Sequence, residues 1–195
     1  KITLLSNDKQ TTTVEFVVNS YQLGKITEKN GNSFVISLPQ GSAIQKKGAP
    51  DVNKLTTSLI VHETQQMNAE VIYSDYIEVK NVDIAPSRGN LYRNMDLDAI
   101  PFAKGKVYEK DEFFPGKLAE LRDPYLLRDF RGQTLITYPL QYNPVKKVLR
   151  IYTKLQVKVT ATGSEGQNQL RVARRQRVLR MRALVHELIR CVLEQ

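Results

Sequence analysis

Short runs rich in Val, Ile, Thr, Tyr and Phe recur along most of the chain and are the feature that most constrains its fold. In the longest run, residues 148–162, Leu149, Ile151, Leu155 and Val157 alternate with polar or charged residues. A period of two places one set of side chains in a core and the other in water. The candidate strands are residues 12–23, 33–38, 56–62, 69–79, 81–85, 133–141 and 148–162. The sequence therefore predicts an all-β, antiparallel fold.

The turns between these runs are marked by Gly, Asn and Pro. Residues 29–32 read KNGN, and Asn143-Pro144 follows the run that ends at residue 141. Dipeptides of this kind favour tight turns between antiparallel strands. We expect residues 134–140 and 149–159 to form one long hairpin around Pro144.

One long segment interrupts the strand pattern before the hairpin. Residues 84–101 read IAPSRGNLYRNMDLDAIP and lack apolar alternation. Connections of this length without regular structure are uncommon, and they are often functional. We expect a long surface loop here.

A helical pattern replaces the strand pattern near the end of the chain. Apolar residues recur there at spacings of three and four: Met181, Leu184, Val185, Leu188, Ile189 and Val192. This spacing predicts an amphipathic helix. We therefore divide the chain into a β domain, residues 1–168, and a C-terminal basic amphipathic helix, residues 169–195.

The formal net charge is +9, from 29 Lys and Arg against 20 Asp and Glu. Seven arginines lie in residues 171–195, opposed by Glu187 and Glu194, so the β domain is only mildly basic. A basic helix can bind nucleic acid or an anionic membrane. The rest of the chain offers no basic patch interleaved with aromatic residues, so we expect neither partner.

Length and composition indicate an ordinary globular protein. The chain has 195 residues, 41% of them hydrophobic, which suffices for one core. Cys191 is the single cysteine and cannot form an internal disulfide. No apolar run approaches the roughly 20 residues that span a bilayer, and the chain does not open on a signal sequence. If the protein is secreted, we expect the signal to have been removed already.

Residues suited to catalysis or metal binding are scarce. The histidines are His62 and His186, and Cys191 lies five residues after His186, on another face of the expected helix. Asp96 and Asp98 lack the further oxygen ligands of a defined calcium loop, and we expect them to be solvated. No paired Cys and His residues and no glycine-rich phosphate loop occur. The sequence predicts no enzyme, no metal site and no cofactor.

Several blocks of sequence carry a resemblance to a known family. They are NVDIAPSRG (81–89), DEFFPG (111–116), LRDPYLLRDFRGQ (121–133), PLQYNPVKKVLRIYT (139–153) and GQNQ (166–169). In order and spacing they resemble the N-terminal propeptide of the arginine-specific gingipains, bacterial cysteine proteases of peptidase family C25. The resemblance is close over residues 75–169 and weaker back to residue 1.

The resemblance implies a jelly-roll-like β-sandwich that covers the active site of a cysteine protease, assists its folding and is removed by cleavage after arginine. It implies a secreted or periplasmic protein that follows a bacterial outer-membrane export route. The catalytic Cys and His of the family belong to the domain that follows the propeptide. The expected partner is therefore a gingipain-like catalytic domain, bound in cis or in trans.

An arginine on the 84–101 loop is the natural ligand for a protease pocket that reads arginine, because a guanidinium pairs with a carboxylate through two hydrogen bonds. Arg93, flanked by Tyr92 and Asn94, falls where the family pattern places the pocket-filling and first-cleaved arginine. Arg88 is the alternative. Arg122, Arg128 and Arg131 are secondary interface candidates.

The segment after Gln169 does not resemble the family and leaves a second function open. In this alternative, the chain is a free-standing binding or assembly module that forms a homodimer through its C-terminal helix. Light scattering before and after deletion of residues 170–195 separates the two hypotheses.

Overall fold

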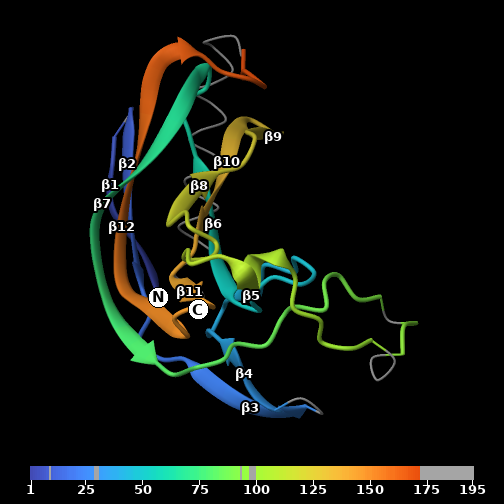
Figure 1. The fold of residues 1–195 in the computed structure, drawn as a ribbon. Helices are drawn as coiled ribbons and strands as arrows, with labels where there is room; N and C mark the ends of the chain where they lie inside the picture. The colour runs from blue at the N-terminus through green and yellow to red at the C-terminus, as the bar shows by residue number, and fades with distance from the viewer. Residues whose placement is uncertain (9, 29–30, 93, 97–99, 172–195) are drawn as a thin grey trace, which may run out of the picture.

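The strands of the described residues form two five-stranded antiparallel sheets and a two-stranded hairpin (Figure 1). The computed structural model describes residues 1–8, 10–28, 31–92, 94–96 and 100–171. The first sheet contains β1 (Ile2–Asn7), β2 (Thr11–Val17), β12 (Val148–Glu165), β11 (Leu140–Asn143) and β7 (Gln65–Lys80). The second sheet contains β5 (Ser42–Ala43), β6 (Asn53–Ile60), β10 (Phe130–Thr137), β8 (Ala119–Leu121) and β9 (Tyr125–Leu127). The hairpin joins β3 (Gln22–Glu28) to β4 (Gly31–Ser37).

The expected all-β, antiparallel fold is confirmed. Every pair of named strands is antiparallel, and the helical residues within the described ranges form a single 3-10 turn, η1 (Lys106–Glu109). The amphipathic helix expected over residues 169–195 lies outside the described residues from 172 onward. Within the described ranges, no helix is long and apolar enough to cross a bilayer.

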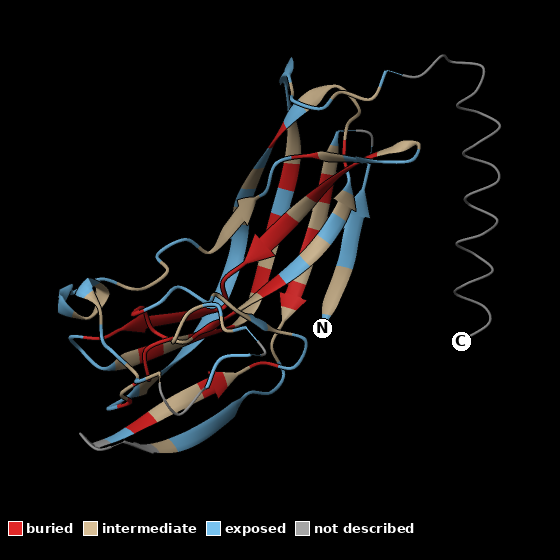
Figure 2. Cartoon of the chain, turned by 90° about the vertical axis from the view of Figure 1, so that its right-hand side faces the viewer, coloured by how far each residue is buried: buried red, intermediate tan, exposed pale blue. Residues whose placement is uncertain are grey.

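The core lies between the two sheets and follows the alternation of β12. Leu149, Ile151, Leu155, Val157 and Val159 are fully buried, and they pack with Val14 and Phe16 of β2 and Leu135 of β10. In Figure 2, buried residues recur along the strands, interleaved with intermediate and exposed residues. Burial of each such side chain stabilises the fold by about 1.5–3 kcal/mol before entropy is subtracted.

The long hairpin expected around Pro144 is only partly correct. β11 pairs with β12 from Leu140↔Ile151 to Asn143↔Val148, as the turn predicted. β10, however, belongs to the second sheet, where it pairs with β6, β8 and β9. The chain changes sheets at Pro139, which has no N–H to continue a strand ladder. The long partners of β12 are instead β7 and β2.

Other strand boundaries also differ from the sequence pattern. The run 12–23 divides into β2 and the start of β3, and residues 81–85 form an isolated bridge at Ile84 rather than a strand. β7 is longer than expected and reaches Lys80. The short strands β1, β5, β8 and β9 were not predicted, because two to six residues carry too little periodicity to identify.

Two buried tyrosines make the free energy of unfolding depend on pH in the alkaline range. Burial, followed by the hydrogen bond that its hydroxyl donates to Glu120 Oε1 (2.6 Å), raises the pKa of Tyr138 to about 12. Burial also raises the pKa of Tyr142 to about 12. An unfolded tyrosine ionises near pH 10, so between about pH 10 and 12 the unfolded chain loses protons that the folded chain keeps.

The free energy of unfolding should therefore be unaffected by these groups below about pH 10 and should fall as the pH rises toward 12. Urea unfolding at several pH values between about 9 and 11 measures the slope. Tyr138→Phe and Tyr142→Phe should each flatten it, because phenylalanine has no proton to lose. An unchanged slope in both variants would exclude these tyrosines as its source.

Candidate functional site

The loop that follows β7 projects from the body of the molecule on a hydrogen-bonded base. In Figure 1 it extends to the right, away from the first sheet. We call residues 83–88 and 102–108 the neck and residues 89–101 the arginine loop. Ile84, Ala85, Pro86 and Ser87 are buried, so the exposed part of the expected 84–101 loop begins only after them.

The backbone of the neck is tied to two neighbouring segments. Ala85 N–H donates to Phe34 O (2.8 Å) of β4, while Asp51 N–H donates to Ala85 O (2.9 Å). Ser87 N–H donates to Ala49 O (2.7 Å), and Gly48 N–H donates to Ser87 O (2.9 Å). This ladder fixes one end of the loop in the body of the fold.

Side chains bring the two ends of the loop together. Lys104 Nζ lies 2.9 Å from both carboxylate oxygens of Asp83, and Tyr108 donates its hydroxyl proton to Ile84 O (2.7 Å). The Arg88 guanidinium lies 3.9 Å from the centre of the Phe102 ring. The ion pair is partly exposed and contributes about 0.2–1 kcal/mol to stability, so the neck depends on several contacts together.

At the neck, the backbones of Gly48 and Gly105 approach each other closely. Gly105 N–H donates to Gly48 O (2.8 Å), and a Cβ on Gly48 would lie 3.2 Å from Gly105 Cα. Gly48 also has φ +76°, a conformation that other residues adopt with strain.

Gly48→Ala is therefore expected to destabilise the fold by about 1–3 kcal/mol and to make the arginine loop more sensitive to proteolysis. Urea unfolding and limited proteolysis measure the two effects. Gly24→Ala in β3 is the matched control, since the nearest atom to its Cβ would be Val35 O at 3.9 Å. Equal stability of the two variants would contradict a close-packed neck.

The tip of the arginine loop is exposed where the structure describes it. Tyr92 is 63% exposed, Asn94 is exposed, and Met95 N–H donates to Tyr92 O (3.1 Å) in a turn. Arg93 lies outside the described residues. Arg88, the alternative arginine, is instead part of the neck and half-buried against Phe102.

The three secondary candidates occupy different environments. Arg122 follows β8 and is exposed. Arg128 is exposed in the turn between β9 and β10, with φ 52°. Arg131 is only 1% exposed, so its guanidinium cannot meet a partner at the surface of this fold.

The Arg131 guanidinium instead binds backbone carbonyl groups in the interior. Nη1 donates to His62 O (2.6 Å) and Gln65 O (2.7 Å), Nη2 donates to Gln167 O (2.8 Å), and Nε lies 3.1 Å from Gln167 O and Asn168 O. Burial lowers the pKa of Arg131. We call these contacts the carbonyl clasp. They join β10 to the turn before β7 and to the segment after β12.

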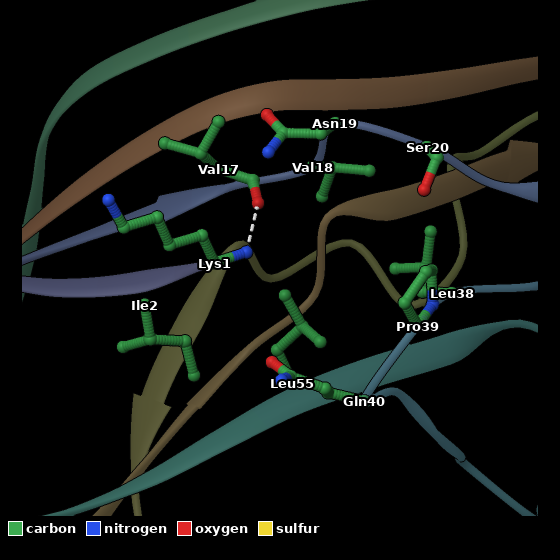
Figure 3. A pocket seen from close by; sticks show the side chains of 10 residues that line it. All are labelled: Lys1, Ile2, Val17, Val18, Asn19, Ser20, Leu38, Pro39, Gln40 and Leu55. Carbon is green, nitrogen blue, oxygen red and sulfur yellow. Dashed lines mark hydrogen bonds between the residues drawn. The ribbon is translucent and has the colours of Figure 1, made fainter. Parts of the chain in front are cut away.

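A cavity of about 410 Å³ opens near the start of the chain (Figure 3). The residues that line it are Lys1, Ile2, Val17, Val18, Asn19, Ser20, Leu38, Pro39, Gln40 and Leu55. The backbone nitrogen of Lys1 donates to Val17 O (2.6 Å) across its edge. The lining is apolar or neutral apart from Lys1, and it contains no pair of groups suited to acid–base or nucleophilic chemistry.

Metal-binding clusters are also absent from the part of the chain that the structure describes. No three His, Cys, Asp or Glu residues in it are placed to hold an ion. His62 Nδ1 accepts from Thr64 N (3.4 Å) and Gln65 N (3.3 Å), and thus caps a turn. His186 and Cys191 lie outside the described residues. The arginine loop and its neck are therefore the candidate site.

Sequence reasoning identified the loop but not the residues that hold it. Gly48, Asp83 and the pair Lys104 and Tyr108 lie on three separate segments of sequence. The sequence marks two of these positions weakly. Gly48 begins a Gly-Ala-Pro turn that follows two lysines, and Lys104 precedes a glycine. Neither signal indicates that the segments meet.

Comparison with known proteins assigns the family. The family model Propeptide_C25 matches residues 1–185, which extends beyond Gln169, where the resemblance seen in the sequence ended. Gingipain R1 and Gingipain R2 of Porphyromonas gingivalis are both 42% identical to the chain, over 167 and 170 residues, or 86% and 87% of its length. The chain spans only 17% and 23% of the length of these relatives.

Two solved structures share the fold. One is a complex of Porphyromonas gingivalis RgpB pro- and mature domains, with a TM-score of 0.85, 42% identity and 88% coverage of each chain. The other concerns the zymogenic latency of gingipain K from the same species, with a TM-score of 0.71, 19% identity, and coverage of 84% of this chain and 93% of the other. The chain belongs to the C25 propeptide family, as the propeptide domain of a gingipain-type cysteine protease and not its catalytic domain.

Proposed function

We propose that this chain keeps an arginine-specific C25 cysteine protease latent by inserting the tip of the arginine loop into the active site of its mature domain. Arg93 fills the primary pocket, with Tyr92 and Asn94 beside it. The observation that carries the proposal is an exposed loop on a hydrogen-bonded neck, in a fold similar to a propeptide solved with its mature domain.

The neck supports this function through preorganisation. A loop whose ends are already held together loses less conformational entropy when it binds. The ladder from Phe34 to Ser87, the Asp83–Lys104 pair and the Gly48–Gly105 contact all restrict the ends of the loop. A loop restricted in this way also resists release after a single cleavage, because both ends remain attached to the body.

The finer parts of the proposal follow from the resemblance. They are a jelly-roll-like β-sandwich over residues 1–168, assistance to folding of the protease, and secretion by an outer-membrane export route. The C-terminal helix over residues 169–195 is proposed separately, from the spacing of its apolar residues. The catalytic domain is the partner, in cis or in trans.

The direct test is inhibition in trans. The purified chain should inhibit the mature domain of Gingipain R2 at a stoichiometry near one to one, measured by hydrolysis of a small arginine substrate. Trypsin is the control: it also reads arginine, but it is a protease of another fold and should be spared. Full protease activity at saturating concentrations of the chain would reject the proposed function.

A further inference from the structure

The outer faces of the two sheets differ in charge. On the first sheet, the outward side chains of β2, β7 and β12 include ion pairs between Arg150 and Glu78 (2.8 Å) and between Lys154 and Glu15 (2.9 Å). Lys158 stands opposite Glu70 on the same face. The exposed Tyr73 and Tyr76 of β7 lie beneath the Lys154 and Arg150 cations, so charge covers this face even where it is aromatic.

The outer face of the second sheet has no charged side chain over residues 56–60 of β6, 130–134 of β10 and 125–127 of β9. Lys54 of β6, and Glu120 of β8 opposite the buried Ile136, lie on the same side beyond this area. Leu135 points into the core, so the residues alternating with it in β10 point outward, as do their partners in β6 and β9. We call these outward residues the uncharged face: Thr56, Ser58, Ile60, Tyr125, Leu127, Phe130, Gly132 and Thr134.

Large apolar side chains are exposed at one end of the uncharged face. Ile60 is 59% exposed and Leu127 is 63% exposed. The Tyr125 ring lies over Gly132, where an added Cβ would come within 2.5 Å of it, so the ring fills the space that a larger residue would take. Depletion of charge together with exposed aliphatic and aromatic groups is the composition of an interface core.

The uncharged face lies on the same side of the molecule as the arginine loop. In Figure 1 the first sheet forms the left wall, and the loop extends to the right, on the side of the second sheet. A protease domain that receives the loop is thus brought toward the second sheet rather than the first. The exposed Arg128, in the turn beside Leu127, lies at the rim of the face.

We propose that the uncharged face is a second docking surface for the mature protease domain, separate from the arginine loop. This inference rests on the proposed function, because it takes the same partner. The loop is recognised by the arginine pocket of the protease and supplies specificity. The face supplies apolar contact that slows dissociation. A propeptide with two anchors keeps its protease latent even when one anchor is released.

The test measures binding of the full chain to the mature domain of Gingipain R2 whose nucleophile has been replaced, so that the loop is not cleaved. Ile60→Lys with Leu127→Lys should raise the dissociation constant about 10- to 100-fold, mainly through faster dissociation. The matched control, Ile72→Lys with Tyr73→Lys, places two lysines at exposed apolar positions of β7, each 48% exposed, and should change affinity less than about twofold. Thermal unfolding confirms that both variants are folded.

A third variant separates this inference from the proposed function. Arg93→Ala removes the contact made by the loop and should act independently of the face. The fold increases in the dissociation constant from Arg93→Ala and from the face variant should therefore multiply in the combined variant. If Arg93→Ala has no effect while the face variant binds weakly, the face is supported and the loop assignment fails. If the face variant binds as tightly as the β7 control, the inference is overturned, whatever Arg93 does.

Light scattering tests whether a second copy of the chain, rather than the protease, covers the uncharged face. We expect the free chain to be a monomer. A dimer that Ile60→Lys with Leu127→Lys dissociates would assign the face to a second copy and would overturn the inference.

Discussion

Replacing Arg93 by alanine is expected to weaken inhibition of the mature protease by about 30-fold to several thousand-fold. A guanidinium that fills a desolvated pocket makes charge-assisted, bidentate hydrogen bonds, and removing one partner of such a pair costs about 2–5 kcal/mol. Each 1.4 kcal/mol corresponds to a factor of ten in the inhibition constant. The inhibition constant against the mature domain of Gingipain R2 measures the loss.

Two further variants show which arginine, and which feature of its side chain, the protease recognises. Arg93→Lys keeps the positive charge but loses the planar fork, so it should fall between the wild type and Arg93→Ala. Arg88→Ala should have a small effect, because the Arg88 guanidinium is stacked on Phe102 within the neck. A large loss for Arg88→Ala and none for Arg93→Ala would transfer the pocket-filling role to Arg88.

Arg131→Lys is expected to lower the free energy of unfolding by about 2–4 kcal/mol. The guanidinium lies within hydrogen-bonding distance of the carbonyl oxygens of His62, Gln65, Gln167 and Asn168. Lysine keeps a buried charge but presents its donors from one nitrogen, so it cannot serve carbonyl groups on both sides of the clasp. Each buried carbonyl that loses its donor costs about 1–3 kcal/mol, partly recovered by local relaxation. Urea unfolding measures the difference.

The matched control for the clasp is Arg128→Lys. Arg128 is exposed in the turn between β9 and β10, where a change of this kind should stay within about 0.5 kcal/mol of the wild type. Hydrogen exchange should also show faster exchange near residues 166–170 in Arg131→Lys, because the clasp holds that segment. Equal stability of the two variants would show that the clasp carbonyls find other donors.

The carbonyl clasp illustrates what a sequence pattern does not reveal. In the sequence, Arg131 is one of three arginines in LRDPYLLRDFRGQ, and all three were interface candidates. Its position in β10 points it inward, where residues 62–65 and 167–168 arrive from distant parts of the chain. Burial of a charge depends on these long-range contacts, which have no local signature.

The strand exchange at Pro139 has a related explanation. The apolar pattern identified strands on both sides of this residue, and the Asn143-Pro144 turn correctly predicted the β11–β12 pairing. Alternation shows which side chains face a core, but it does not show which sheet a strand joins. That choice depends on the partners, here β6, β8 and β9 for β10.

The sequence by itself determined the all-β class, the interior face of β12, the long loop after β7 and the family resemblance, because each depends on local periodicity or on matching blocks of residues. Tertiary structure alone decided the sheet order, the burial of Arg131, the neck beneath the arginine loop and the contrast between the two outer faces. Those features arise where segments far apart in the chain meet, and the energies that select them come from burial and pairing across those contacts.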